Sequence, residues 1–127
     1  MKNSVLQFKN PQLTKLIFEI NPNYVVNNQQ INIKKEFKTN VIHLQENEDI
    51  VEFTIIIGTN DNTSPFYIEA TESAIFKFNG SDEIAKNNLL KCNAPAVLLG
   101  YLRPIISTIT ALSPYSAYNL PLIDFTE

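Results

Sequence analysis

Apolar and polar side chains alternate with a period of two before Gly80, and this pattern constrains the fold more than any other feature. The segment IVEFTIII places four apolar residues on one face: Val51, Phe53, Ile55 and Ile57. KLIFEI (15–20), QINIKKEFK (30–38) and FYIEATESAIFKF (66–78) alternate similarly. Such alternation is typical of antiparallel strands with one face on a core. With Asn-rich turn signals between the segments, the sequence predicts a meander of four strands.

The period changes after Gly80 to that of a helix. Ser81 is the expected N-cap of a helix over 82–91, which the sequence NAP then interrupts. Pro95 suits the first turn of a second helical segment. Pro104 lies inside that segment, and its ring would press on the carbonyl four residues earlier. The predicted fold class is therefore α+β: a four-stranded antiparallel sheet followed by a long kinked helix, in a single domain covering 1–127.

The second helical segment has two usable faces. An apolar stripe is expected from Leu98, Tyr101, Leu102, Ile105, Ile109 and Leu112. Another face carries small residues, with a lone cation alongside: Ala96, Gly100, Ser107, Ala111 and Arg103. This small-residue face packs either on the protein's own sheet or, as a helix–helix contact, on another copy of the chain.

Bulk properties exclude some classes of protein. The net charge of -3 and the absence of a Lys/Arg cluster argue against a nucleic-acid binder. The stretch from Ala94 to Leu112 is long enough to span a bilayer. However, a central Arg103 costs about 2.5–3.5 kcal/mol there, which favours a buried or interface helix. A lone Cys92 and an N-terminus without an apolar signal core predict a cytoplasmic location.

Groups that carry chemistry are sparse. His43 is the only histidine and has strand-like neighbours, so it is expected to be an ordinary strand residue. Cys92 is expected to act as a small hydrophobe. Glu46, Glu48 and Asp49 lack the ligand alternation and glycine of a calcium loop, and they predict a solvated turn. We therefore expect no enzymatic activity, no metal site and no cofactor.

Four motifs in order resemble the SecB family of export chaperones, which hold unfolded preproteins. LTKLIFEINPN (13–23) is similar to the first strand of that family, and FYIEATESAIFKFNG (66–80) to its fourth strand. APAVLLGYLRPIISTIT (94–110) resembles the main helix, with its Tyr-x-Arg, and NLPLIDF (119–125) resembles the crossover segment, one residue shorter before its proline.

The resemblance implies a tetramer, formed as a dimer of dimers, that binds unfolded polypeptide in apolar grooves without chemistry. It also implies that the helices join the dimers, so the expected oligomer interface is the small-residue face with Arg103. Aromatic residues in the apolar C-terminal segment are expected to line a groove opposite the first strand. The expected client-binding residues are Phe8, Leu16, Phe18, Tyr101, Tyr115, Tyr118, Leu120 and Leu122. The alternative for the two C-terminal tyrosines is a strap packed on the protein's own surface.

The sequence also departs from the family pattern. Family members continue into a second helix and a tail that contacts the SecA motor, and neither follows Glu127 here. Glu19 and Glu69 match two positions of an acidic SecA-contact patch, whereas Lys15 replaces a third acid. Family relatives without the tail include chaperones dedicated to one antitoxin. Export and antitoxin protection thus remain alternatives, with a non-catalytic scaffold for one folded partner as a third.

Overall fold

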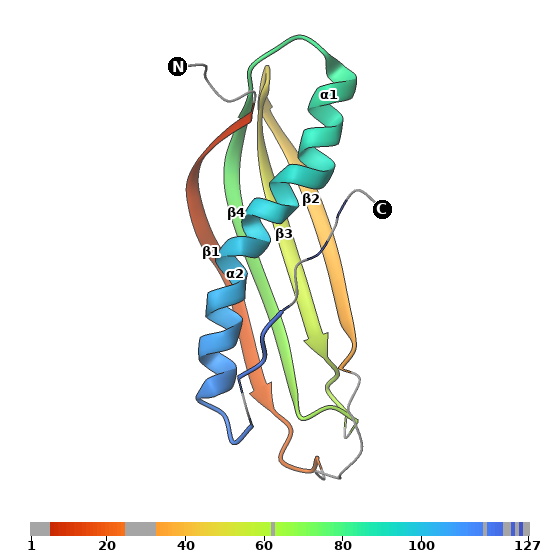
Figure 1. Ribbon diagram of the computed structural model, residues 1–127, viewed down its shortest axis with the longest axis vertical. Coiled ribbons are helices and arrows are strands. Elements are labelled where there is room, and N and C mark those ends of the chain that lie inside the picture. The colour runs from red at the N-terminus through yellow and green to blue at the C-terminus, as the bar shows by residue number, and fades with distance from the viewer. Residues whose placement is uncertain are drawn as a thin grey trace.

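The fold is a single four-stranded antiparallel sheet with one long helical segment lying diagonally across one face (Figure 1). The structure is a computed structural model that describes residues 6–24, 33–61, 63–115, 117–120, 123 and 125. The strands are β1 (Leu6–Ile20), β2 (Lys35–Gln45), β3 (Glu48–Gly58) and β4 (Phe66–Phe78), and the sheet order is β1-β4-β3-β2. The predicted meander is therefore wrong for β1, which pairs with β4 instead of β2. The predicted α+β fold, a four-stranded antiparallel sheet followed by a long helical segment, is confirmed.

Strand alternation produces the core. On the helix-covered inner face, β3 buries Val51, Phe53, Ile55 and Ile57, each with no exposed surface. β4 alternates in step from Phe66 to Phe78, because residues paired across antiparallel strands point to the same face. The predicted core face of β3 is therefore correct.

Two strands differ from the sequence prediction in their extent. β1 begins at Leu6, nine residues before the predicted segment, because a register shift between Lys9 and Gln12 accommodates Pro11 on this edge strand. Asn10 adopts a left-handed φ of 56° there, which asparagine tolerates. β2 begins at Lys35, later than the alternation in QINIKKEFK suggested, and continues through His43.

Close backbone approach explains the glycine at the end of β3. Gly58 has φ 81°, and a Cβ atom there would lie 2.1 Å from the carbonyl oxygen of Phe66. Only glycine fits both constraints. The end of β3 can therefore approach the backbone of Phe66, the first residue of β4, before the loop between the two strands.

The helical part is continuous, which corrects the predicted interruption at NAP. Helix α1 (Glu83–Asn88) passes through a π-helical turn (Leu89–Asn93) into α2 (Ala94–Ala111). The N-cap is Asp82, not Ser81, and its Oδ1 accepts from the N–H groups of Ile84 and Ala85 at 3.0 and 3.2 Å. α2 continues through Pro104. The irregularity thus lies at the π-helical turn, upstream of the predicted position.

The buried stripe of α2 also differs from the prediction. Leu98, Leu102, Ile106 and Thr110 have no exposed surface, whereas Leu112 is 83% exposed. These buried residues are four positions apart, slightly more than one helical turn of 3.6 residues. The buried stripe therefore winds slowly around α2, as expected for a helix that crosses the sheet diagonally (Figure 1). By length and composition alone, Glu83–Ala111 is a candidate membrane span. A core helix passes the same test, and α2 packs on β3 and β4.

Candidate functional site

Exposed apolar side chains follow the inner side of edge strand β1. Phe8 pairs with Phe76, and Leu16 pairs with Ala70, so both lie on the helix side of the sheet. Their exposed fractions are 42% and 41%. The Phe8 ring lies 5.7 Å from that of Phe76 and 6.2 Å from that of Tyr101 on α2. Phe8, Leu16 and Tyr101 thus belong to one surface beside α2, which we call the β1 ledge. Two further exposed residues, Leu13 and Ile20, complete the β1 ledge and were missed by sequence reasoning.

Phe18 lies on the same face of β1 but occupies a different environment from the residues of the β1 ledge. It is half-buried, and its ring lies 6.1 Å from Phe66. Phe66 also contacts Tyr115 and Tyr118, at ring distances of 6.4 and 6.0 Å. These aromatic residues therefore pack on one another below the end of α2.

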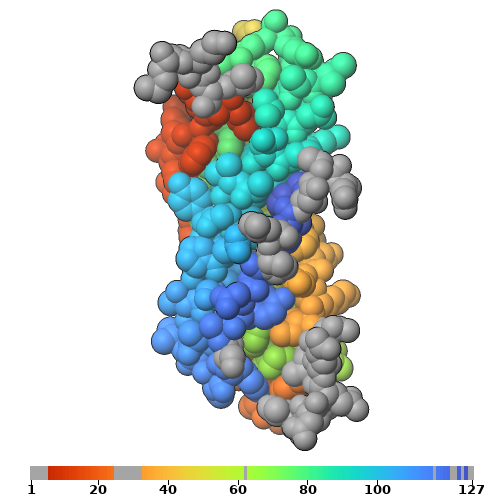
Figure 2. Space-filling model, viewed as in Figure 1, coloured from red at the N-terminus to blue at the C-terminus, as the bar shows by residue number. Residues whose placement is uncertain are grey.

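The C-terminal strap, the described residues from Ser113 to Phe125, covers the inner face on the other side of α2. Figures 1 and 2 show its blue trace between α2 and β2. Leu120 is 2% exposed. The Phe125 ring lies 5.5 Å from that of Phe53 and 6.4 Å from that of Phe37. Predicted site residue Leu122 lies outside the described residues.

Hydrogen bonds attach described residues of the strap to α2 and to the π-helical turn before it. The N–H of Tyr118 donates to Thr110 Oγ1 at 2.7 Å, and Arg103 Nε donates to the carbonyl oxygen of Leu120 at 3.2 Å. Cys92 Sγ donates to the carbonyl oxygen of Phe125 at 3.3 Å. Helix α2 therefore stands between the β1 ledge and most of the strap. The predicted opposite walls approach one another only around Phe66.

The small residues of α2 face outward. Ala96, Gly100 and Ala111 are exposed, and a Cβ atom added at Gly100 would meet nothing within 4 Å. The alternative in which this face packs on the protein's own sheet is therefore wrong. Arg103 and Ser107, predicted for the same surface, are half-buried and bond to the strap instead.

The predicted acidic residues lie on the outer face of the sheet. Lys15 forms an ion pair with Glu69, and Tyr67 Oη donates to Glu69 Oε1 at 2.9 Å. Hydrogen bonding to Lys15 and then to Tyr67 lowers the pKa of the Glu69 carboxyl. The hydrogen bond to Glu69, more than burial, raises the pKa of the Tyr67 hydroxyl. Lys15 thus offsets the charge of one of the two acids, whereas Glu19 pairs across the strands with Tyr67.

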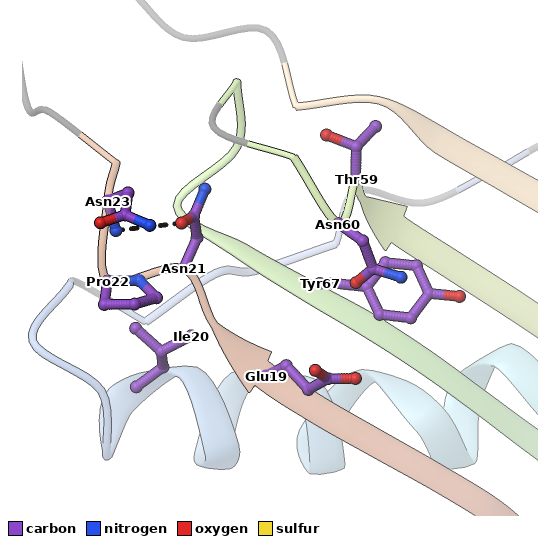
Figure 3. Close-up of a pocket in the computed structure, with 8 residues that line it drawn as sticks. All are labelled: Glu19, Ile20, Asn21, Pro22, Asn23, Thr59, Asn60 and Tyr67. Carbon is purple, nitrogen blue, oxygen red and sulfur yellow. Dashed lines mark hydrogen bonds between the residues drawn. The ribbon is translucent and has the colours of Figure 1, made fainter.

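A polar cavity of about 260 Å³ lies beside Glu19 at the end of the sheet (Figure 3). Asn21 shapes its rim, because its Oδ1 accepts from the N–H of Asn23 at 3.0 Å and its Nδ2 donates to the carbonyl oxygen of Ser64 at 3.1 Å. The Tyr67 ring forms part of the opposite side. The cavity thus places Glu19 beside neutral residues from two loops, Asn21–Asn23 and Thr59–Asn60.

Two buried carboxyls were not identified from the sequence. Asp49 was expected in a solvated turn but is 4% exposed, and its oxygens lie 3.1 Å from His43 Nδ1 and 3.7 Å from Lys86 Nζ. Glu72 is 3% exposed on the inner face, and its Oε1 has no hydrogen-bond partner among the described residues. Burial raises the pKa of the Glu72 carboxyl. No three described His, Cys, Asp or Glu side chains gather as a metal site requires.

Comparison with known families matches residues 5–127 to SecB, described as preprotein translocase subunit SecB. The protein-export protein SecB of Alkalilimnicola ehrlichii is 27% identical over 97 residues, which cover 76% of this chain but only 50% of that protein. The protein-export protein SecB of Orientia tsutsugamushi (strain Boryong) is 26% identical over 124 residues, covering 96% of this chain and 73% of that protein. The chain thus spans half the length of the first relative.

Solved structures show the same fold. A SecB-like chaperone of Mycobacterium tuberculosis, in complex with a peptide from the HigA1 antitoxin, superposes with a TM-score of 0.73 at 13% identity, covering 93% of this chain and 90% of that one. A protein of unknown function from Streptococcus agalactiae superposes with a TM-score of 0.51 at 12% identity, covering 91% and 96%.

Proposed function

The chain belongs to the SecB family, and from that premise we propose that it is a holdase, a chaperone that binds non-native polypeptide without chemistry. Membership in a chaperone family confirms the prediction that the protein is not an enzyme. We assign the whole chain, residues 1–127, to one chaperone domain acting in the cytoplasm.

The observation that carries this proposal is the β1 ledge. Five large apolar residues there are each 40–42% exposed: Phe8, Leu13, Leu16, Ile20 and Tyr101. Monomeric soluble proteins seldom expose contiguous apolar patches of more than a few hundred Å², and larger patches mark interaction sites. An edge strand also offers backbone groups to an extended chain. The ledge therefore supplies both kinds of contact that an unfolded client needs.

The strap has a secondary part in this proposal. Tyr115, Tyr118 and Leu120 contact the protein's own core, so their packing supports the position of the strap. We propose that a client meets the exposed edges of the two tyrosines, while Leu120 fixes the strap from below. Phe18 serves the same client surface through its contact with Phe66.

A dedicated antitoxin chaperone is the second candidate function. It is favoured by the Mycobacterium tuberculosis protein, whose structure contains an antitoxin peptide. A non-catalytic scaffold for one folded partner is the third. The candidates differ in client range, because a general holdase binds many unrelated unfolded chains and the other two bind one.

We further propose that copies associate through the outward face of α2, formed by Ala96, Gly100 and Ala111, into a tetramer built as a dimer of dimers. Small exposed residues on this face permit a close helix approach. Glu19 and Glu69 are proposed as SecA contacts. Because Lys15 is paired with Glu69, the affinity for SecA should be weak.

Suppression of aggregation tests the proposed function. Several unrelated proteins are denatured and diluted with and without a stoichiometric amount of the chain, and light scattering is followed. A general holdase lowers the scattering of most of them. Suppression of none rejects the holdase proposal, and suppression restricted to an antitoxin selects the second candidate.

A further inference from the structure

Glu72 is a buried carboxyl in an otherwise apolar layer. It lies on the inner face of β4 and is 3% exposed, and its Oε1 has no hydrogen-bond partner among the described residues. An acid buried in this way costs free energy, which is normally offset by a cation or by hydrogen-bond donors. Such uncompensated groups are rare in folded proteins, and they concentrate where function requires them.

The described elements packed around Glu72 do not supply a cation. Its cross-strand neighbours are Leu13 on β1 and Phe53 on β3, and both are neutral. Arg103 is the one charged residue of α2, and its Nε donates to the carbonyl oxygen of Leu120 in the strap. None of the ion pairs between described side chains involves Glu72. The described protomer therefore leaves this carboxyl without a counter-charge.

Glu72 lies next to the exposed edge of the sheet. Leu13, its partner on the edge strand, belongs to the β1 ledge and is 40% exposed. Side chains paired across antiparallel strands have Cβ atoms about 5 Å apart. On β4 itself the two neighbours on the same face, Ala70 and Ala74, are small. The carboxyl is thus one strand away from the surface proposed for the client.

Two irregularities in β1 flank this position. The register with β4 shifts between Lys9 and Gln12, and again between Leu13 and Lys15. Each shift inserts one extra residue into β1, and bulges of this kind bend a strand and re-aim its side chains. Figure 1 shows the first half of β1 curving outward at the edge of the sheet. Because bulges are over-represented beside active sites, this part of the edge is a candidate for ligand contact.

We infer that Glu72 forms a subsite of the β1 ledge for one basic side chain, a Lys or Arg of the client polypeptide. The inference rests on the proposed holdase function. Phe8, Leu13 and Leu16 contact the apolar side chains of the client segment. The stem of the Lys or Arg packs along Leu13, and its charged end reaches the carboxylate. The subsite adds a requirement for one cation to an otherwise apolar mode of client binding.

A double-mutant cycle tests this pairing, because it isolates the interaction between one protein group and one peptide group. Two labelled unstructured apolar peptides differ at one central residue, which is Lys in one and Nε-acetyl-lysine in the other. Acetylation removes the charge and retains the stem. Binding to wild type, Glu72→Gln and Glu52→Gln is measured by fluorescence anisotropy. Glu52→Gln is the matched control, because it makes the same change on the outer face of β3.

Wild type should bind the Lys peptide roughly threefold to tenfold more tightly than the acetylated peptide. In Glu72→Gln the ratio of the two affinities should fall by that factor, whereas Glu52→Gln should keep it close to the wild-type value. Because both variants remove one carboxyl, the comparison discounts the long-range attraction of a basic peptide to a protein of net charge -3. Circular dichroism should show the same fold in all three proteins.

Each other outcome overturns the inference in a distinguishable way. An unchanged ratio in Glu72→Gln, with both peptides still bound, overturns the cation subsite alone. An equal fall in both variants assigns the preference to net charge. Failure of both peptides to bind wild type contradicts the holdase function and the subsite together. If the ratio is unchanged and Glu72→Gln, unlike Glu52→Gln, shifts the oligomeric state in light scattering, the carboxyl faces a second copy of the chain instead of a client.

Discussion

The hydroxyl of Thr110 accepts a hydrogen bond from the backbone N–H of Tyr118 at 2.7 Å and donates one to the carbonyl oxygen of Ile106 at 2.7 Å. Thr110 has no exposed surface. One buried hydroxyl therefore joins the last turn of α2 to the C-terminal strap. Through this contact the end of the helix determines where the strap begins its path along the sheet.

Thr110→Val should destabilise the protein by about 1–3 kcal/mol, because the N–H of Tyr118 loses its acceptor while the side-chain volume hardly changes. Urea unfolding followed by circular dichroism measures the difference. Thr110→Ser retains the hydroxyl and removes a methyl group, so it serves as the control. A fully stable Thr110→Val variant would show that the strap does not depend on this contact.

Glu72→Gln should stabilise the protein at pH 7. Burial raises the folded-state pKa of this carboxyl above its ordinary value of 4.5, so ionisation disfavours the folded state. Wild-type stability should therefore fall as the pH rises above 4.5 and level off above the folded-state pKa.

The neutral amide should remove this contribution and raise stability by on the order of 1 kcal/mol at pH 7. Urea unfolding from pH 4 to pH 8 compares the two proteins. Parallel pH profiles would contradict the assigned environment of Glu72. Glu52→Gln, on the outer face of β3, is the control for the same substitution outside the core.

The contrast between Val51 and Asp49 shows which features the sequence could predict. Strand alternation is local, so it located the inner face of β3 correctly at Val51 and beyond. The burial of Asp49 depends on Lys86, which α1 brings back over the sheet from far along the chain. Local composition therefore suggested a solvated turn.

The candidate site was predictable to a similar degree. The apolar character of Phe8 and Leu16 was visible in the sequence, but their exposure depends on where α2 crosses the sheet. The predicted apolar stripe of α2 was wrong at Leu112, because a helix that crosses the sheet obliquely buries residues that are four positions apart. Parity along β4 would have placed Glu72 with Phe66 and Ile68 on the inner face. Only the structure shows that its Oε1 has no hydrogen-bond partner among the described residues.

Asp49→Asn should loosen α1, because Lys86 would lose the carboxylate that holds it against the sheet. We expect a loss of about 1–3 kcal/mol in stability. Hydrogen exchange should show reduced protection of the α1 amides. His43→Gln is the control: the His43 side chain is 64% exposed, so its pairing with Asp49 should contribute less than about 1 kcal/mol.

Gly100→Leu should weaken the proposed association between copies without disturbing the protomer. The added side chain meets open space within one chain. Across a close helix contact, the same overpacking costs about 1–3 kcal/mol. Light scattering over a range of concentrations should show a larger dissociated fraction than in Gly100→Ala. Identical oligomer distributions in Gly100→Leu and wild type would remove Gly100 from the interface.

Leu16→Ser should weaken client binding, because it removes apolar contact area from the centre of the β1 ledge. The expected loss in binding free energy is about 1–2 kcal/mol. Stability should change less than for a core residue, since Leu16 is 41% exposed. Ile17→Ser is a matched control on the opposite face of the same strand, where Ile17 pairs with Glu69. Anisotropy titrations with an unfolded client should separate the two variants. Equal affinity in both would place the client surface away from β1.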